Sequence, residues 1–201
     1  MNKKLTVKRL IIFLVISFLP FLIIIPIAWA YYGEPLYASQ KTEVQDFVSI
    51  LGGLGMMIPT VAHLITRVIT KEGFRNTYLG LNFKGHAGWY ILSVVEKLIE
   101  GAVTFLLIYA VFMSDLPVSE AFSSEGLARN IGLYLLQLAF ALIIFIPAFG
   151  EEWGWRGYMM PKLCELIPKP AAVIVGGIIW GLWHAPLTVA GQNYGLDYPG
   201  Y

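Results

Sequence analysis

The sequence from residue 131 to residue 158 reads IGLYLLQLAFALIIFIPAFGEEWGWRGY, an apolar run that ends in two carboxylates and a guanidinium. Residues 131–149 carry no charged side chain and are long enough to cross a bilayer core as a helix. Ionisable groups are costly in lipid, so we expect those that follow to face a protein interior or a water-filled cavity. The stretch therefore predicts a membrane-embedded helix with a functional site at its end.

Further apolar segments predict an all-α fold, a polytopic transmembrane helix bundle with five spans in this chain. The other four predicted spans are residues 10–29, 47–66, 89–113 and 171–190. The composition agrees, because 57% of the residues are hydrophobic and 13% are charged, whereas about a quarter are charged in soluble domains. The positive residues lie between the hydrophobic segments, so we expect the lipid bilayer and no nucleic acid as a partner.

Lysine and arginine residues alternate between the two sides of the predicted bundle. They are frequent before the first span, between the second and third spans, and between the fourth and fifth, whereas the other side has only Lys41 and Arg129. Cytoplasmic loops of membrane proteins carry an excess of these residues. We therefore expect a multi-pass protein of the cell membrane with a cytoplasmic N-terminus and the acidic motif toward the cytoplasm.

The acidic motif contains candidates for peptide hydrolysis. At helical spacing Glu152 and Arg156 lie on one face and can pair, whereas Glu151 points about 100° away. A second polar group, His184, lies within the predicted span 171–190 and shares a helix face with Trp180. We predict that Glu151 polarises a water molecule with help from His184, and that the Glu152–Arg156 pair holds the site in shape.

The motif Glu-Glu-x-x-x-Arg, followed about thirty residues later by aromatic-x-x-x-His, resembles the CPBP family of intramembrane proteases. This family includes the type II CAAX prenyl endopeptidases and the bacterial Abi and bacteriocin-immunity proteins. The resemblance covers residues 129–201 and implies an intramembrane endopeptidase with the catalytic residues Glu151, Glu152, Arg156 and His184. Its implied substrate is a peptide or a prenylated protein, with a pocket at Trp155 and Trp180.

The family's third motif, His-x-x-x-Asn or His-x-x-x-Asp, is absent from residues 1–201. In the family this motif supplies the oxyanion donors, so we expect the chain to be the N-terminal part of a longer protein. The predicted domains are residues 1–128, with three transmembrane helices, and residues 129–201, the first part of the catalytic domain. The family's aromatic residue is more often Phe, whereas this chain has Trp180.

Several alternatives stay open at this point. The chain can be a protease for CAAX-type or bacteriocin-related processing, or a non-catalytic immunity or peptide-binding protein of the membrane. Transport is a weaker hypothesis, based on Glu96, Glu100 and His63, whose simpler roles are hydration and helix packing. A divalent metal such as zinc is a candidate cofactor, with Glu151 and His184 as ligands, and Glu152 as a third only if it is not bound to Arg156.

Overall fold

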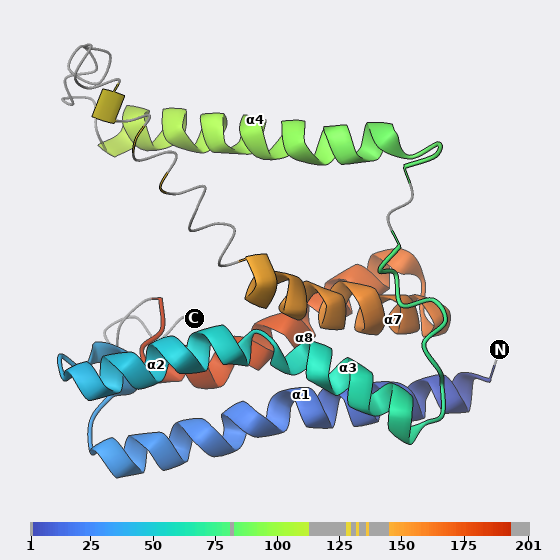
Figure 1. The fold of residues 1–201 in the computed structure, drawn as a ribbon, viewed down its shortest axis with the longest axis horizontal. Helices are drawn as coiled ribbons and strands as arrows, with labels where there is room; N and C mark the ends of the chain where they lie inside the picture. Colours follow the sequence, from blue (N-terminus) through green and yellow to red (C-terminus); the bar gives the residue numbers. More distant parts are fainter. Residues whose placement is uncertain are drawn as a thin grey trace. The chain divides into compact units, whose positions relative to one another are not determined.

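A computed structural model describes residues 2–80, 83–112, 128–129, 132, 136 and 145–193 of the chain (Figure 1). All regular secondary structure in these residues is helical, which confirms the predicted all-α class. The chain forms two units, residues 1–77 with 142–201, and residues 78–141. All of the predicted catalytic residues belong to the first unit. The predicted domain boundary at residues 128/129 stays a prediction.

The first unit begins with a long apolar helix, α1 (Lys3–Tyr32). The side chain of Asn2 caps its start by accepting a hydrogen bond from the Leu5 backbone N–H at 3.3 Å. Gly33 ends it in the left-handed conformation, with φ of 69°, which glycine adopts without a steric penalty. The helix is long and apolar enough to cross a membrane, in agreement with the predicted first span.

A short turn of 3-10 helix, η1 (Leu36–Ala38), leads to the helices α2 (Thr42–Gly55) and α3 (Ile58–Ile69). These two helices meet at 43°, so the predicted span 47–66 is a bent pair of helices rather than one straight helix. The bend follows Gly55, where an added Cβ would lie only 2.7 Å from the ring of Phe21 on α1. The glycine therefore permits a close approach of α2 to α1.

The acidic motif lies on a continuous helical stretch of residues 145–166. This stretch contains a turn of π-helix, η2 (Trp155–Met159), and ends as α7 (Met160–Leu166). Pro168 then precedes α8 (Lys169–Val189), which is also long and apolar enough to cross a membrane. π-Turns within helices occur frequently at functional sites, and this one begins three residues after Glu152.

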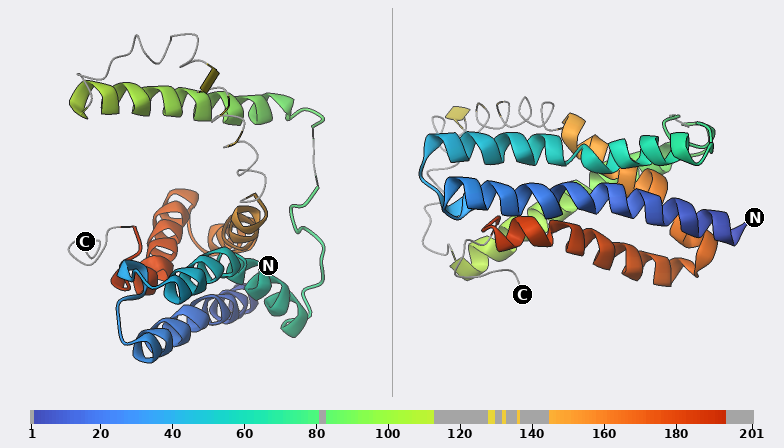
Figure 2. Two further views of the ribbon diagram at one scale, coloured as in Figure 1. Left: turned by 60° about the vertical axis from the view of Figure 1, so that its left-hand side comes forward. Right: turned by 90° about the horizontal axis from the view of Figure 1, so that it is seen from below.

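The helix α1 packs against α3, α7 and α8 (Figure 2). Aromatic rings fill the shared core. The ring of Phe13 meets Trp155 edge-on at 5.4 Å between centroids, and Trp155 meets Trp183 in the same way at 5.5 Å. The ring of Phe21 also packs against Trp183, at 4.9 Å between centroids. This row of rings joins α1, η2 and α8, and it positions the two helical segments that carry the predicted catalytic residues.

The five predicted spans are not confirmed. Within the described part of the chain, two helices are long and apolar enough to cross a membrane, or three if the bent pair is one span. The helix α4 (Ala87–Phe112), in the second unit, is not among these candidate membrane-spanning helices; it carries Glu96, Lys97 and Glu100. Most of the predicted span 131–149 lies outside the described residues. The transport hypothesis based on Glu96 and Glu100 stays a prediction.

Candidate functional site

The acidic motif is held against the junction of α2 and α3 by two glycines. The backbone carbonyl of Gly150 accepts a hydrogen bond from the Thr60 hydroxyl. A Cβ on Gly150 would collide with the Met57 side chain, and one on Gly154 would come within 2.6 Å of the Pro59 carbonyl oxygen. Glycine at both positions lets the two backbones touch. The carboxylates of Glu151 and Glu152 lie between these two contacts in the sequence.

Glu152 and Arg156 form the predicted pair. The Arg156 Nη1 atom lies 2.8 Å from Glu152 Oε1, one helical turn apart, and both side chains are about half exposed. Exposed ion pairs contribute little to stability, typically below about 1 kcal/mol. The pair therefore orients the guanidinium and contributes little to the stability of the fold.

Glu151 has a different environment, as its position on the helix predicts. Its side chain is only 7% exposed. The indole Nε1–H of Trp180, on α8, donates a hydrogen bond of 2.5 Å to Glu151 Oε1. A hydrogen bond to a carboxylate is about twice as strong as one between neutral groups. This bond joins the two sequence motifs and leaves the second carboxylate oxygen as the candidate acceptor for a water proton.

Trp180 contacts three of the four predicted catalytic residues. Besides its bond to Glu151, its ring lies under the Arg156 guanidinium, whose central carbon is 5.1 Å from the ring centroid. The His184 ring packs edge-on against it at 4.9 Å. The sequence predicts Trp180 as a substrate-pocket residue but not its hydrogen bond to Glu151, because the donor and acceptor are 29 residues apart.

His184 has one ring nitrogen bound to its own helix. Its Nδ1 atom lies 3.0 Å from the backbone carbonyl oxygen of Trp180. A carbonyl oxygen only accepts hydrogen bonds, so Nδ1 carries the proton, and in the neutral ring Nε2 is left as an acceptor. This tautomer suits a general base or a group that orients water.

A cavity of about 430 Å³ lies between η2 and α8, beside these residues. Trp155 and Trp180, the predicted pocket residues, both border it, although Trp155 is fully buried among the core rings. The lining side chains are mostly apolar and include one charged group. They are Trp155, Arg156, Met159, Met160, Val173, Gly176, Gly177 and Trp180.

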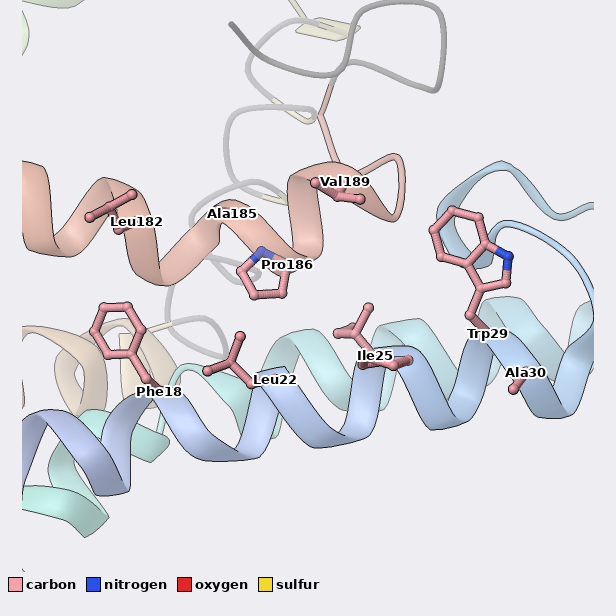
Figure 3. A pocket seen from close by; sticks show the side chains of 10 residues that line it. Phe18, Leu22, Ile25, Trp29, Ala30, Leu182, Ala185, Pro186 and Val189 are labelled. Carbon is pink, nitrogen blue, oxygen red and sulfur yellow. The ribbon is translucent and has the colours of Figure 1, made fainter.

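A larger groove of about 780 Å³ runs between α1 and α8 (Figure 3). Its walls carry no charged side chain. They are Phe18, Leu22, Ile25, Pro26, Trp29 and Ala30 from α1, and Leu182, Ala185, Pro186 and Val189 from α8. Ala185 directly follows His184, so one wall of this groove adjoins the predicted catalytic histidine.

The side chains predicted as zinc ligands do not form a ligand set. Among the described residues, no three or more His, Cys, Asp or Glu side chains are grouped so that they could hold a metal ion. Glu152 is bound to Arg156, and Glu151 accepts a hydrogen bond from Trp180. A catalytic zinc usually has three protein ligands and a structural zinc has four. Zinc binding by Glu151 and His184 therefore stays a prediction from the sequence.

A polar cluster that the sequence did not predict surrounds Glu72, in the turn after α3. Its carboxylate lies 2.5 Å from Lys162 Nζ and 3.3 Å from Arg9 Nε, and accepts a hydrogen bond of 2.9 Å from the Tyr158 hydroxyl. Burial alone would raise the pKa of the Glu72 carboxyl, but these hydrogen bonds and charges outweigh it and lower that pKa. The cluster also brings Arg9, Glu72 and Lys162 together at one end of the helices.

His63 packs inside the protein next to the motif. It is fully buried on α3, where the Arg67 Nε–H donates a hydrogen bond of 2.6 Å to His63 Nε2. Its ring stacks on Tyr158 at 4.5 Å and meets Trp153 edge-on at 5.0 Å. Helix packing, the simpler role given to His63, is confirmed by these contacts.

Comparisons with known proteins point to one family. Residues 133–196, which contain all the predicted site residues, match the family described as Type II CAAX prenyl endopeptidase Rce1-like. CAAX prenyl protease 2 of Methanococcus maripaludis is 33% identical over 96 residues, which are 46% of this chain and 35% of that protein. The match thus spans about a third of the length of that curated relative. No solved structure matches the chain.

Proposed function

We infer that this chain, whose residues 133–196 belong to the Rce1-like family of type II CAAX prenyl endopeptidases, acts as an intramembrane endopeptidase. The observation that carries the proposal is the contact of Trp180 with Glu151, Arg156 and His184. Side chains from two helices thereby meet around one buried carboxylate. A buried ionisable group with specific partners beside a cavity is the usual setting of a catalytic group.

The proposed chemistry uses the two groups that keep an acceptor atom. Glu151, held through Oε1 by Trp180, takes a proton from water, and His184 orients the same water through Nε2. The oxygen of that water attacks the carbonyl carbon of the peptide bond. The protonated Glu151 then returns the proton to the leaving amine nitrogen as the carbon–nitrogen bond breaks. The Glu152–Arg156 pair keeps its geometry throughout this sequence.

The groove between α1 and α8 supports a lipid-modified substrate (Figure 3). Its walls are apolar along their length, and its volume falls in the range of about 300–1,000 Å³ that small ligands occupy. An isoprenoid chain is a ligand of this chemistry, because it offers hydrocarbon without hydrogen-bonding groups. We therefore propose a prenylated peptide or protein as substrate, cleaved at the cytoplasmic face of the cell membrane.

The test is cleavage of a farnesylated, fluorescence-quenched peptide by the full-length protein in lipid vesicles. Glu151→Gln and His184→Ala should each abolish cleavage while the protein still inserts in the membrane. Glu43→Gln, a change at an exposed position in the first turn of α2, is the matched control and should cleave normally. Full activity of both site variants would refute the proposal.

A non-catalytic membrane immunity or peptide-binding protein is distinguished in the same experiment. Such a protein would bind the peptide without cleaving it, and its binding would survive Glu151→Gln. If the wild type cleaves the peptide, and Glu151→Gln binds the peptide without cleaving it, the result supports the peptidase.

A further inference from the structure

Exposed basic side chains gather at one end of the first unit, where the start of α1, the turn after α3 and the start of α8 lie (Figure 2). The polar cluster around Glu72 joins these segments through α7. The acidic residues of these segments and of α7 are Glu72 and Glu165, and both are bound to groups of that cluster. The exposed basic residues, called the basic surface below, form no ion pair with any residue in the described part of the chain. They are Lys3, Lys4, Lys8, Lys71, Arg75 and Lys169.

The length of α1 places the basic surface at the level of lipid headgroups. Residues 10–29 carry no charge and extend about 30 Å at about 1.5 Å per residue, which is the thickness of the hydrocarbon core. The residues of α1 before them, Lys3–Arg9, extend about 10 Å further. The headgroup layers on the two sides together add about 10–15 Å to the bilayer. The first lysines of α1 therefore lie where the lipid phosphates lie.

The turn after α3 presents its side chains on a fixed backbone. The guanidinium of Arg67, which is only 3% exposed, donates hydrogen bonds to three backbone carbonyl oxygens of this turn. The acceptors are Gly73 at 2.6 Å, Arg75 at 3.1 Å and Asn76 at 3.1 Å. The side chains of Phe74 and Arg75 remain exposed. A backbone that is fixed in advance loses little conformational freedom when it binds a ligand.

The groups on this surface restrict what binds there. Ammonium and guanidinium groups bind phosphate oxygens. Phe74 in the turn, and Val68 and Ile69 at the end of α3, add exposed apolar contacts beside the charges. A ligand that combines a negative phosphate with hydrocarbon chains meets both kinds of group. A phosphatidylcholine headgroup fits less well, because its choline adds a positive charge that this surface repels.

We propose that the basic surface binds an anionic phospholipid. The phosphate lies against the lysines of α1 and of the turn after α3, and the acyl chains lie along the apolar side chains that precede this turn. The bond from Arg9 to Thr70, at 3.3 Å, keeps the two segments side by side. The inference does not depend on the proposed peptidase function, because none of the proposed catalytic residues takes part in it.

The experiment is native mass spectrometry of the full-length protein in detergent, titrated with phosphatidylglycerol or with phosphatidylcholine of the same acyl chains. The wild type should bind phosphatidylglycerol at least tenfold more tightly than phosphatidylcholine. The triple variant Lys4→Gln/Lys8→Gln/Lys71→Gln should bind phosphatidylglycerol at least tenfold more weakly than the wild type, since each basic side chain near an anionic lipid surface contributes about fivefold. Its affinity for phosphatidylcholine should change by less than about threefold, because that headgroup has no net charge.

Two further variants control for charge and for position. Lys4→Arg/Lys8→Arg/Lys71→Arg keeps all three charges and should keep the preference for phosphatidylglycerol. Lys41→Gln removes a basic charge at the start of α2, outside the basic surface, and should leave the affinity for phosphatidylglycerol unchanged.

Several results would overturn the proposal. They are equal affinity of the wild type for the two lipids, an unchanged affinity in the glutamine triple variant, and the same loss in Lys41→Gln. Inorganic phosphate and a glutamate-rich peptide, each added at the concentration of the lipid, should not displace phosphatidylglycerol. Displacement by phosphate would assign the surface to a free anion, and displacement by the peptide would assign it to an acidic protein.

Discussion

Replacing Trp180 by Phe tests the link between the two halves of the site. The substitution keeps an aromatic ring beside Arg156 and His184 but removes the indole N–H that donates to Glu151 at 2.5 Å. A hydrogen bond to a charged group contributes about 1.5–3 kcal/mol. If that bond positions Glu151 in the transition state, its loss lowers kcat by about 10- to 150-fold, since each 1.36 kcal/mol corresponds to a tenfold change in rate.

The assay is kcat and KM for cleavage of the farnesylated peptide by the full-length protein in vesicles. KM should change little, because the bond supports Glu151 rather than the peptide. Trp153→Phe is the matched control, on the helix that carries the acidic motif. It removes an indole N–H that donates to the Thr77 backbone carbonyl at 2.7 Å, outside the proposed catalytic set.

Trp153→Phe should cost about 1 kcal/mol of stability and leave kcat within about threefold of wild type. Wild-type kcat in Trp180→Phe, or an equal kcat loss in the control, would refute a positioning role for the bond to Glu151.

Other predictions concern the supports of the site. Gly154→Ala should lower the free energy of unfolding by at least about 1–3 kcal/mol, because the new Cβ collides with the Pro59 backbone. Gly53→Ala is the control and should be neutral or stabilising, because the space around its Cβ is open. Thermal unfolding in detergent compares the two variants. Glu72→Gln should cost about 2 kcal/mol, because Arg9 and Lys162 lose the carboxylate that they share and Lys162 keeps only Glu165, at 3.8 Å. The lowered pKa of Glu72 means that its contribution is complete above the unfolded value of about 4.3 and is lost as pH falls through the folded value. The melting temperatures of wild type and Glu72→Gln should therefore begin to converge as pH falls below about 4.3, and a constant difference between them would contradict this assignment.

Local spacing was sufficient to predict the pairing within the motif. A separation of four residues on one helix places Glu152 beside Arg156. The rotation of about 100° per residue places Glu151 on a different face of the helix, toward Trp180. The apolar runs likewise predicted α1 and α8. These predictions succeed because each depends only on residues that are close in the sequence.

Features that depend on distant residues were not predicted. The glycines at 176, 177 and 181 all suggest close helix approach in a sequence, but only Gly176 is in close contact among the described residues. The bend between α2 and α3 and the bond from Trp180 to Glu151 likewise require knowledge of which helix lies beside which. Periodicity does not contain that information.

The rings of α1 have a mechanical consequence for the proposed catalysis. Phe13 touches Trp155 on the segment that carries Arg156, and Phe21 touches Trp183 on the helix that carries His184. The first helix supplies no reactive atom of the proposed site, yet its rings pack against both halves of that site. A change of ring size at position 13 or 21 would alter how far apart the carboxylate and the imidazole are held. Selection for the proposed reaction would therefore act on a helix that supplies none of the proposed catalytic groups.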